Sequence, residues 1–368
     1  MAGAVAGAIS TGAGLWAVRE YRRHFTTIDA TSAASTGVDA FVTLSGADEG
    51  VGPAFSATSC ASCHGVPTVG GSGLVTTLRV ARRNTDGTIH SYGGGLVVPL
   101  FAFASDCQAV IPADANVFSR RLPTTTFGSG LIEAISDAEL LALEDPDDRD
   151  GDGVSGRAAR VHDLESGESR IGRFGWKAQQ ATLLGFAAQA YFHEMGVTND
   201  HYPADAVLGL SAAQVRECEA HADPEDQRQV DTGLRSIDLL ATFMKSLPEP
   251  EPAPATTDTE AGREWFATVG CAACHRPQVG TARAYSDFLL HDIGTGDGIP
   301  EGDAGPHEMR TAPLWGIRFR HLHLHDGSAG SVAAAIERHS GEADAARRRF
   351  TAMSAADQRQ LVAFVKSR

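Results

Sequence analysis

Two short runs decide how this chain is organised: Cys60-Ala61-Ser62-Cys63-His64 and Cys271-Ala272-Ala273-Cys274-His275. In each run two thiols are separated by two residues, and a histidine directly follows the second thiol. This spacing is typical of c-type haem attachment, in which the thiols form thioethers to the two vinyl groups of one haem and the imidazole ligates the iron from one side. The sequence therefore predicts two covalently bound haem c groups, one at each run.

Paired cysteines have other uses, which must be weighed against haem attachment. The two pairs together could complete one four-thiolate zinc site, or either pair could be a redox-active dithiol. Both alternatives leave the trailing histidine unexplained in each copy, and neither pair lies in the strand and helix pattern of a thioredoxin-like dithiol. Haem attachment is favoured because the whole five-residue motif occurs twice.

The length and charge of the chain limit its function. Its 368 residues are too many for one cytochrome module and suit two or three domains with ample core. The 31 Lys and Arg residues against 46 Asp and Glu give a net charge of −15. This balance argues against binding to nucleic acid or to an anionic membrane and favours a soluble protein or a basic partner.

The N-terminal segment and the two remaining cysteines bear on export. Residues 1–18 are small and apolar, but they lack the basic residues that open a signal peptide and are too short for a membrane span. We interpret residues 1–45 as the remnant of an export signal followed by a lead-in helix, and expect no transmembrane anchor. Haem c attachment implies a periplasmic or otherwise exported protein. In such an oxidising compartment Cys107 and Cys218 either form a disulfide or remain as buried free thiols.

A proline-rich segment divides the chain. Prolines alternate with glutamate and alanine over residues 248–254, which favours an extended polyproline linker over a helix. We therefore place a first haem domain at residues 46–247, the linker at 248–258 and a second haem domain at 259–368.

The apolar pattern outside the haem motifs indicates mostly helices. An apolar stripe with a period near 3.6 runs over residues 177–195. His193 and Met195 at its end are candidate iron ligands, although a methionine on an apolar helix is more often part of the core. Residues 74–118 contain short Val, Leu and Phe runs that indicate strands or extended loops. The predicted fold class is mainly α, with two cytochrome-c-like haem domains, long loops and a few short strands.

An acidic run that ends at Gly153 contains three alternating aspartates, Asp148, Asp150 and Asp152. Alternate carboxylates in a tight loop converge on one cation, as in the first half of an EF-type calcium loop. The glutamate expected at the twelfth loop position is replaced by Ala159. The run predicts a calcium site, with an acidic solvated turn as the alternative.

Glu133 is a lone carboxylate in the apolar run from Leu131 to Ile135. It is either a residue on a helix surface or a partly desolvated acid, whose raised pKa would suit acid–base work on a peroxide. Its spacing alone favours the surface position.

Several runs, in a fixed order around the two haem motifs, resemble the bacterial di-haem oxidoreductases. These runs are Arg173-Phe174-Gly175-Trp176-Lys177-Ala178, Leu289-Leu290-His291-Asp292, Arg310-Thr311-Ala312-Pro313-Leu314-Trp315-Gly316, Leu324-His325-Asp326-Gly327 and His339-Ser340-Gly341-Glu342-Ala343. The resemblance covers nearly the whole chain, from about Gly46 to the C-terminus. That family is similar to the di-haem cytochrome c peroxidases and to relatives that oxidise protein side chains.

The resemblance implies roles for particular residues. It implies a peroxide-reactive haem in the first domain and an electron-transfer haem in the second, with His64 and His275 as proximal ligands and a calcium ion near the domain interface. It makes Glu133 the acid–base candidate, because the surrounding apolar run is similar to the family's own. The distance from Pro123 to Glu133 is longer than in the peroxidases. Trp176 is a candidate electron relay between the haems, or else a buried core residue.

The sixth ligand of the second haem is open among four residues. Met309 lies four residues before Pro313, close to where the peroxidases supply a methionine, and His307, His325 and His339 compete with it. A thioether raises the potential of the iron relative to a second imidazole, so this choice sets the direction of electron flow.

The sequence thus predicts a di-haem oxidoreductase of peroxidase type. It would reduce hydrogen peroxide or another small oxidant at the first haem, with electrons from a redox partner protein relayed through the second. One alternative is an electron carrier in which both irons are six-coordinate. Another keeps the oxidising haem but acts on a side chain of a partner protein or on an organic molecule.

Overall fold

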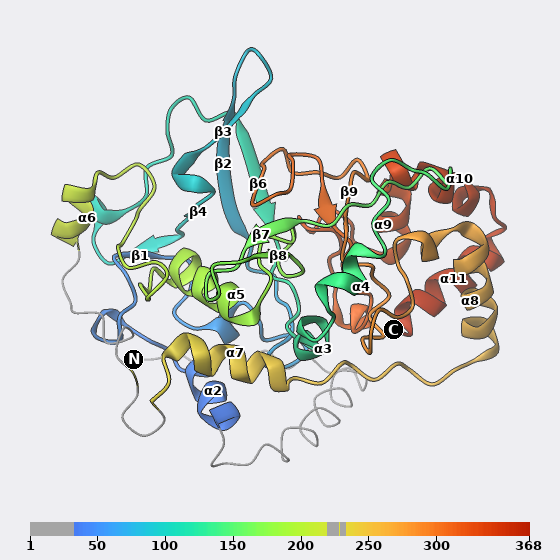
Figure 1. Ribbon diagram of the computed structural model, residues 1–368, viewed down its shortest axis with the longest axis horizontal. Coiled ribbons are helices and arrows are strands. Elements are labelled where there is room, and N and C mark those ends of the chain that lie inside the picture. Colours follow the sequence, from blue (N-terminus) through green and yellow to red (C-terminus); the bar gives the residue numbers. More distant parts are fainter. Residues whose placement is uncertain (1–32, 219–227, 229–232) are drawn as a thin grey trace, which may run out of the picture.

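The computed structural model describes residues 33–218, 228 and 233–368. The predicted export-signal remnant lies outside these residues, whereas helix α2 (Ala33–Val42) lies where the lead-in helix was predicted. In the first half, α2, α5 (Leu183–Ala190) and α7 (Ser236–Ser246) pack together, with the short helices α3 (Ser129–Glu133) and α4 (Asp137–Leu141) beside them (Figure 1). Helix α6 (Ala212–Cys218) lies at the far edge of this half.

The apolar stripe predicted at residues 177–195 forms a shorter helix than expected. Ala178 has a positive φ of 50°, which interrupts helical geometry, and α5 begins only after Thr182, whose hydroxyl accepts a hydrogen bond from the Gly185 amide. The last turn, Tyr191–Met195, is π-helical and ends at Gly196 with a φ of 67°. The period of the apolar residues therefore located the helix but not its start.

Short strands are more numerous than the sequence indicated. Strand β2 (Thr77–Arg83) pairs antiparallel with β3 (Ile89–Ser91), β4 (Val97–Val98) and β6 (Val117–Arg121). Three further antiparallel pairs join strands of two or three residues: β1 (Ala54–Phe55) with β5 (Phe101–Ala102), β7 (Arg160–His162) with β8 (Ser169–Ile171), and β9 (Leu290–His291) with β10 (Met309–Arg310). The pairs β1–β5, β2–β6 and β9–β10 join segments far apart in the sequence, so the local apolar pattern could not reveal them.

The second half is a small helical unit. Helices α8 (Thr257–Val269) and α11 (Ala355–Lys366) pack closely, because Gly262 leaves room for the Gln360 carbonyl where a Cβ would lie only 2.0 Å from that oxygen. Helices α9 (Val332–Arg338) and α10 (Asp344–Ala352) complete the unit. The proline-rich segment predicted as a linker runs without helix or strand between α7 and α8 (Figure 1).

The two halves share part of one hydrophobic core. Phe288, Leu289 and Trp315 from the second half belong to the same buried cluster as Phe243 of α7 and Leu183 of α5. The second half also has its own cluster around Phe266 and Phe364. The shared core holds the sites of the two halves next to each other.

Candidate functional site

The first Cys-x-x-Cys-His motif opens onto a cavity of about 130 Å³. Cys60 begins the 3₁₀ turn η2 (Cys60–Ser62), and the His64 amide donates to the Cys60 carbonyl at 2.9 Å, so both thiols and the imidazole reach this cavity. Nδ1 of His64 lies 3.1 Å from the Gly71 carbonyl oxygen. This contact orients the ring, as carbonyl contacts of metal-binding histidines typically do, and the Thr124 backbone is a second hydrogen-bond partner of the ring.

Five charged side chains form a buried wall beside the first cavity: Arg79, Arg121, Lys177, Asp297 and Glu301. Arg79 and Arg121 line the cavity directly. Arg121 pairs with Asp297 at 2.6 Å and also contacts Glu301, while Nζ of Lys177 lies 3.1 Å from Asp297. Burial would raise the pKa of Glu301, but Arg121 and Arg79 lower it to about 2. Three cations therefore face two ionised carboxylates, and the wall carries one net positive charge.

The π-helical turn at Tyr191–Met195 brings His193 and Glu194 to the first cavity. Single π-turns within helices are frequently found at functional sites. The backbone is fixed here, because the Glu194 carbonyl accepts a hydrogen bond from the Ser56 amide at 2.7 Å. Oε2 of Glu194 and Nδ1 of His193 are buried and have no hydrogen-bond partner among the described residues.

Burial shifts the protonation of these two neighbours in opposite directions. It raises the pKa of Glu194 to about 7, although Arg79 acts against this shift, and it lowers the pKa of His193 to about 4. Glu194 therefore exchanges a proton near neutral pH, whereas His193 is a neutral imidazole there. Adjacent groups whose pKa values are shifted by their surroundings are typical of acid–base sites.

Glu133, the acid–base candidate from sequence, lies elsewhere. It ends α3, and it is not among the described residues that line either cavity. One carboxylate oxygen accepts a hydrogen bond from the Leu183 amide at the start of α5, and the other pairs with Lys245, each at 2.8 Å. Sequence reasoning missed Glu194, which, like Glu133, is a carboxylate in an apolar run, because only the run around Glu133 was matched to the family's own.

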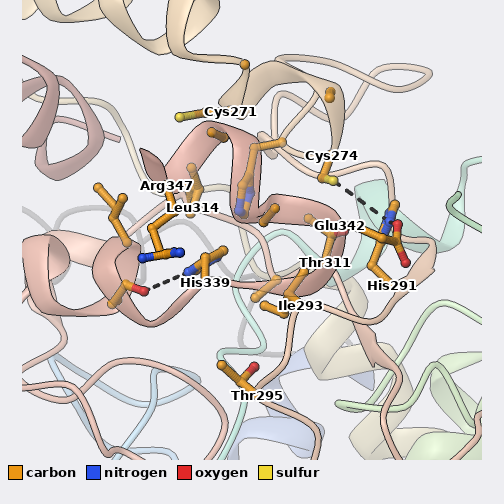
Figure 2. A pocket seen from close by; sticks show the side chains of 18 of the residues that line it. Cys271, Cys274, His291, Ile293, Thr295, Thr311, Leu314, His339, Glu342 and Arg347 are labelled. Atoms are coloured by element: carbon orange, nitrogen blue, oxygen red, sulfur yellow. Dashed lines mark hydrogen bonds and ion pairs between the residues drawn. The ribbon is translucent and has the colours of Figure 1, made fainter. Parts of the chain in front are cut away.

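The second Cys-x-x-Cys-His motif opens onto a larger cavity of about 500 Å³, and Figure 2 shows Cys271 and Cys274 among its lining side chains. Cys271 begins the 3₁₀ turn η7 (Cys271–Ala273) directly after α8. The His275 amide donates to the Cys271 carbonyl at 2.9 Å, as in the first motif. Nδ1 of His275 lies 2.9 Å from the Tyr285 carbonyl oxygen, which leaves Nε2 for a metal.

Three of the four candidates for a sixth ligand line the second cavity, namely Met309, His325 and His339, whereas His307 does not. Burial, with a smaller contribution from His339, lowers the pKa of His275 to about 4.

Each cavity also contains an arginine with a buried, unpartnered nitrogen. Arg320 lines the second cavity, and burial lowers its pKa to about 10. In the first cavity, Nε of Arg79 has no hydrogen bond and stands 3.7 Å from Glu301. Leaving a buried guanidinium without its partners is unfavourable, and haem propionates are the anions that would pair with it. Together with the thiols and the oriented imidazoles, these arginines fit a haem in each cavity.

Trp176 lines both cavities. Its Nε1 donates to the Leu122 carbonyl at 2.7 Å, which fixes the buried indole. The ring centroid lies 6.3 Å from that of His325, and the Arg320 guanidinium lies 5.8 Å from the indole. The structure thus places Trp176 between the two predicted haem sites.

The three aspartates of the acidic run come together: one carboxylate oxygen from each of Asp148, Asp150 and Asp152 lies within 4.8 Å of the others. Gly151 has a φ of 74°, which the tight loop requires, and it lines the second cavity together with Asp152. Ala159, where an EF-hand has its glutamate, is buried in the core.

Cys107 and Cys218 form a disulfide with a Cα to Cα distance of 5.7 Å. The bond connects the 3₁₀ turn η4 (Ser105–Cys107) to α6. Of the two expectations for these cysteines, the disulfide is confirmed.

Two cavities, each at a Cys-x-x-Cys-His motif, define a protein built to hold two haems. The family model described as "Di-haem oxidoreductase, putative peroxidase" matches residues 104–368. The chain therefore belongs to this di-haem oxidoreductase family. The first haem motif, residues 60–64, precedes the matched range, and the second lies within it.

Solved structures give distant likenesses. A chain of the hydrazine synthase of Kuenenia stuttgartiensis is 14% identical over 100% of this chain and 98% of its own, with a TM-score of 0.45. The diheme peroxidase BthA from Burkholderia thailandensis E264 is 16% identical over 92% of this chain and 86% of its own, with a TM-score of 0.41. A MauG-like protein associated with microbial copper homeostasis is 15% identical over 70% and 92%, with a TM-score of 0.35.

The comparison with curated proteins gives no match. Across the described part of the chain, the helices are all too short or too polar to cross a membrane.

Proposed function

We propose that this di-haem oxidoreductase reduces hydrogen peroxide at a haem held by Cys60, Cys63 and His64. The observation that carries the proposal is Glu194, a buried carboxylate with an unpartnered oxygen and a pKa of about 7, in the same cavity as His64. In the second cavity the corresponding carboxylate, Glu342, is already hydrogen-bonded to His291 at 2.8 Å. Proton exchange with a bound oxidant is therefore assigned to the first cavity.

Covalent attachment of both haems is part of the proposal. The paired thiols supply the thioethers, and the fold is two mainly helical cytochrome-c-like haem domains, at residues 46–247 and 259–368, joined by the linker at 248–258. One haem motif lies before the linker and the other lies after it, which supports this division. The shared hydrophobic core keeps the two domains in contact.

The chemistry to be served is H2O2 + 2H⁺ + 2e⁻ → 2H2O. Bound haem iron supplies the redox step that breaks the O–O bond. Ionised Glu194 accepts the proton of the peroxide oxygen that binds first and returns it to the oxygen that leaves. The net positive charge of the wall beside this cavity favours negative charge that develops on the leaving oxygen.

Cys271, Cys274 and His275 would hold the second haem, which would supply electrons for reduction at the first cavity. Trp176 lines both cavities, which supports its indole as the relay between them. The donor is a redox partner protein. The net charge of −15 favours a partner with a basic docking face.

Asp148, Asp150 and Asp152 hold a calcium ion in this proposal. Their carboxylates converge in a loop that also lines the second cavity, which supports a structural ion at this position. A periplasmic or otherwise exported location is supported by the disulfide, since such bonds persist in oxidising compartments.

Low-temperature electron paramagnetic resonance before and after hydrogen peroxide tests the central proposal. We expect a high-spin ferric signal from an open first haem, and we expect peroxide to consume it. Two low-spin signals that do not respond to peroxide in the oxidised or half-reduced protein would instead identify an electron carrier.

A further inference from the structure

The second cavity is lined by more histidines than one iron requires: His275, His291, His323, His325 and His339. A histidine that ligates a metal usually donates the N–H of its other ring nitrogen to a carbonyl or carboxylate, which fixes the tautomer and aims the lone pair. The hydrogen bonds of the five rings therefore distinguish a pre-oriented ligand from a bystander.

His339 has the same ring anchoring as the two proximal histidines. Its Nδ1 lies 2.7 Å from the Ala335 carbonyl oxygen, compared with 3.1 Å for the corresponding contact of His64 and 2.9 Å for that of His275. The remaining nitrogen, Nε2, makes no hydrogen bond to a described residue. Figure 2 shows His339 with this contact drawn, among the side chains around the pocket.

The backbone holds His339 firmly at this position. The residue caps the C-terminal end of α9, with its amide donating to the Ile336 carbonyl at 3.1 Å. The next amide, of Ser340, donates to the Ile293 carbonyl at 2.9 Å, which ties the end of the helix to another wall of the cavity.

The other three histidines lack this combination. Both ring nitrogens of His291 are occupied, Nε2 by Asp287 at 3.0 Å and Nδ1 by Glu342 at 2.8 Å. The rings of His323 and His325 make no hydrogen bond within the described residues, so nothing fixes their tautomers. Only His275 and His339, among the described histidines of this cavity, show an anchored Nδ1 and an open Nε2.

Met309, the sequence candidate, is held in a different way. It lies on β10, opposite His291 of β9, and its side chain is buried at the cavity wall. A residue that only packs between the paired strands would have the same buried position. The Met309 thioether has no N–H group, so it cannot be oriented by a hydrogen bond of the kind that orients His339.

We propose that His339 is the sixth ligand of the second haem, opposite His275, and that Met309 packs against the macrocycle. The inference rests on the proposed haem at Cys271 and Cys274. Two imidazoles give the iron a lower potential than an imidazole and a thioether would. The second haem is then a stronger reductant toward the first than a methionine-ligated haem would be.

Substitution of each candidate, followed by spectroscopy of the oxidised protein, tests the assignment. His339→Gly should convert the second haem from low spin to high spin, and added imidazole should restore the low-spin signal by occupying the vacated position. Met309→Leu should leave that signal unchanged. The wild-type protein should also lack the near-infrared charge-transfer band that iron–thioether bonding produces.

The opposite pattern would overturn the assignment: a thioether band in the wild-type protein, or a low-spin signal lost in Met309→Leu and kept in His339→Gly. If His339→Gly is not obtained folded, His339→Met decides the question, because it should gain a thioether band that the wild-type protein lacks. Haem content by intact mass is measured in parallel. A missing second haem in the wild-type protein would defeat the proposed function, whereas two haems with thioether ligation would defeat only the role of His339.

Discussion

The two haem cavities begin with the same five-residue motif and differ in what faces it. In the first, an unpaired carboxylate, a neutral imidazole and a positively charged wall surround a small space. In the second, about 500 Å³ is lined by histidines, one of which repeats the anchoring of the proximal ligand. The motif thus predicts where a haem is attached, whereas residues more than sixty positions away, Glu194 in the first cavity and His339 in the second, form the surroundings proposed to leave one iron open and close the other.

Among the substitutions that test the difference between the cavities, Glu194→Gln is expected to have the largest effect. The amide keeps the size of the side chain but cannot accept the peroxide proton, so peroxide reduction should fall by about 10²- to 10⁴-fold. Steady-state turnover and the loss of the high-spin signal in a single turnover measure this fall. Glu133→Gln is the matched control and should remain within a few-fold of wild type, because Glu133 lies outside both cavities. Equal losses in the two variants would remove the distinction between these carboxylates.

Breaking the charged wall of the first cavity is expected to cost stability. Asp297→Asn leaves three buried cations against one carboxylate, and removing one partner of a buried pair typically costs about 3–5 kcal/mol. Urea unfolding followed by haem absorbance measures the change. In the control Asp303→Asn, the lost pair with Arg157 is partly exposed, so the cost should be about 1 kcal/mol or less. Similar urea midpoints for the two variants would show that the ion pairs of Asp297 do not stabilise the wall more than an exposed pair does.

The pH dependence of peroxide reduction should also follow Glu194. Its carboxyl must be ionised to accept a proton, and its pKa is raised to about 7. Activity should therefore rise with pH up to about 7 and level off above it, falling by up to about tenfold for each unit below. Plots of kcat/KM against pH measure this dependence. In Glu194→Gln the rise in kcat/KM below pH 7 should disappear. If the rise below pH 7 is unchanged in the variant, a group other than Glu194 controls the pH dependence.

Trp176→Phe tests the connection between the cavities. Phenylalanine loses the hydrogen bond to the Leu122 carbonyl, which costs about 1 kcal/mol of stability, and removes the indole from both cavities. We expect slower reduction of the first haem by the second, with the high-spin signal and its reaction with peroxide retained. Trp315→Phe is the control, because this indole is buried outside both cavities and its Nε1 has no partner among the described residues. Equal electron transfer in both variants and wild type would exclude Trp176 as the relay.

The sequence revealed those parts of the site whose residues are close neighbours along the chain. The two haem motifs and the convergent aspartates each lie within a few positions, so their spacing alone predicts the local arrangement. Glu194 was not selected, and His339 remained one of four candidates for the sixth ligand, because the roles of both depend on tertiary contacts. The raised pKa of Glu194 comes from burial, and the role of His339 depends on a cavity built jointly by α8, α9 and the strand pair β9–β10. Glu133 was ranked first instead because its run is similar to the family's own, and nothing in that run indicated that the Leu183 amide and Lys245 would occupy both carboxylate oxygens.

The most local expected effect concerns calcium and should be confined to the second cavity. Because Gly151 and Asp152 line that cavity, an ion held by the three aspartates would stabilise its wall and leave the first cavity unaffected. At a calcium concentration 100 times the Kd, the gain is about 2.7 kcal/mol. We expect a chelator to lower the melting temperature and shift the spectrum of the second haem only. Asp150→Asn should weaken this dependence, whereas Asp145→Asn, which alters the neighbouring pair with Arg149, should not. If the chelator changes neither the melting temperature nor the spectrum, the aspartates form a solvated turn. If the chelator shifts the spectrum of the first haem, the two cavities are not independent.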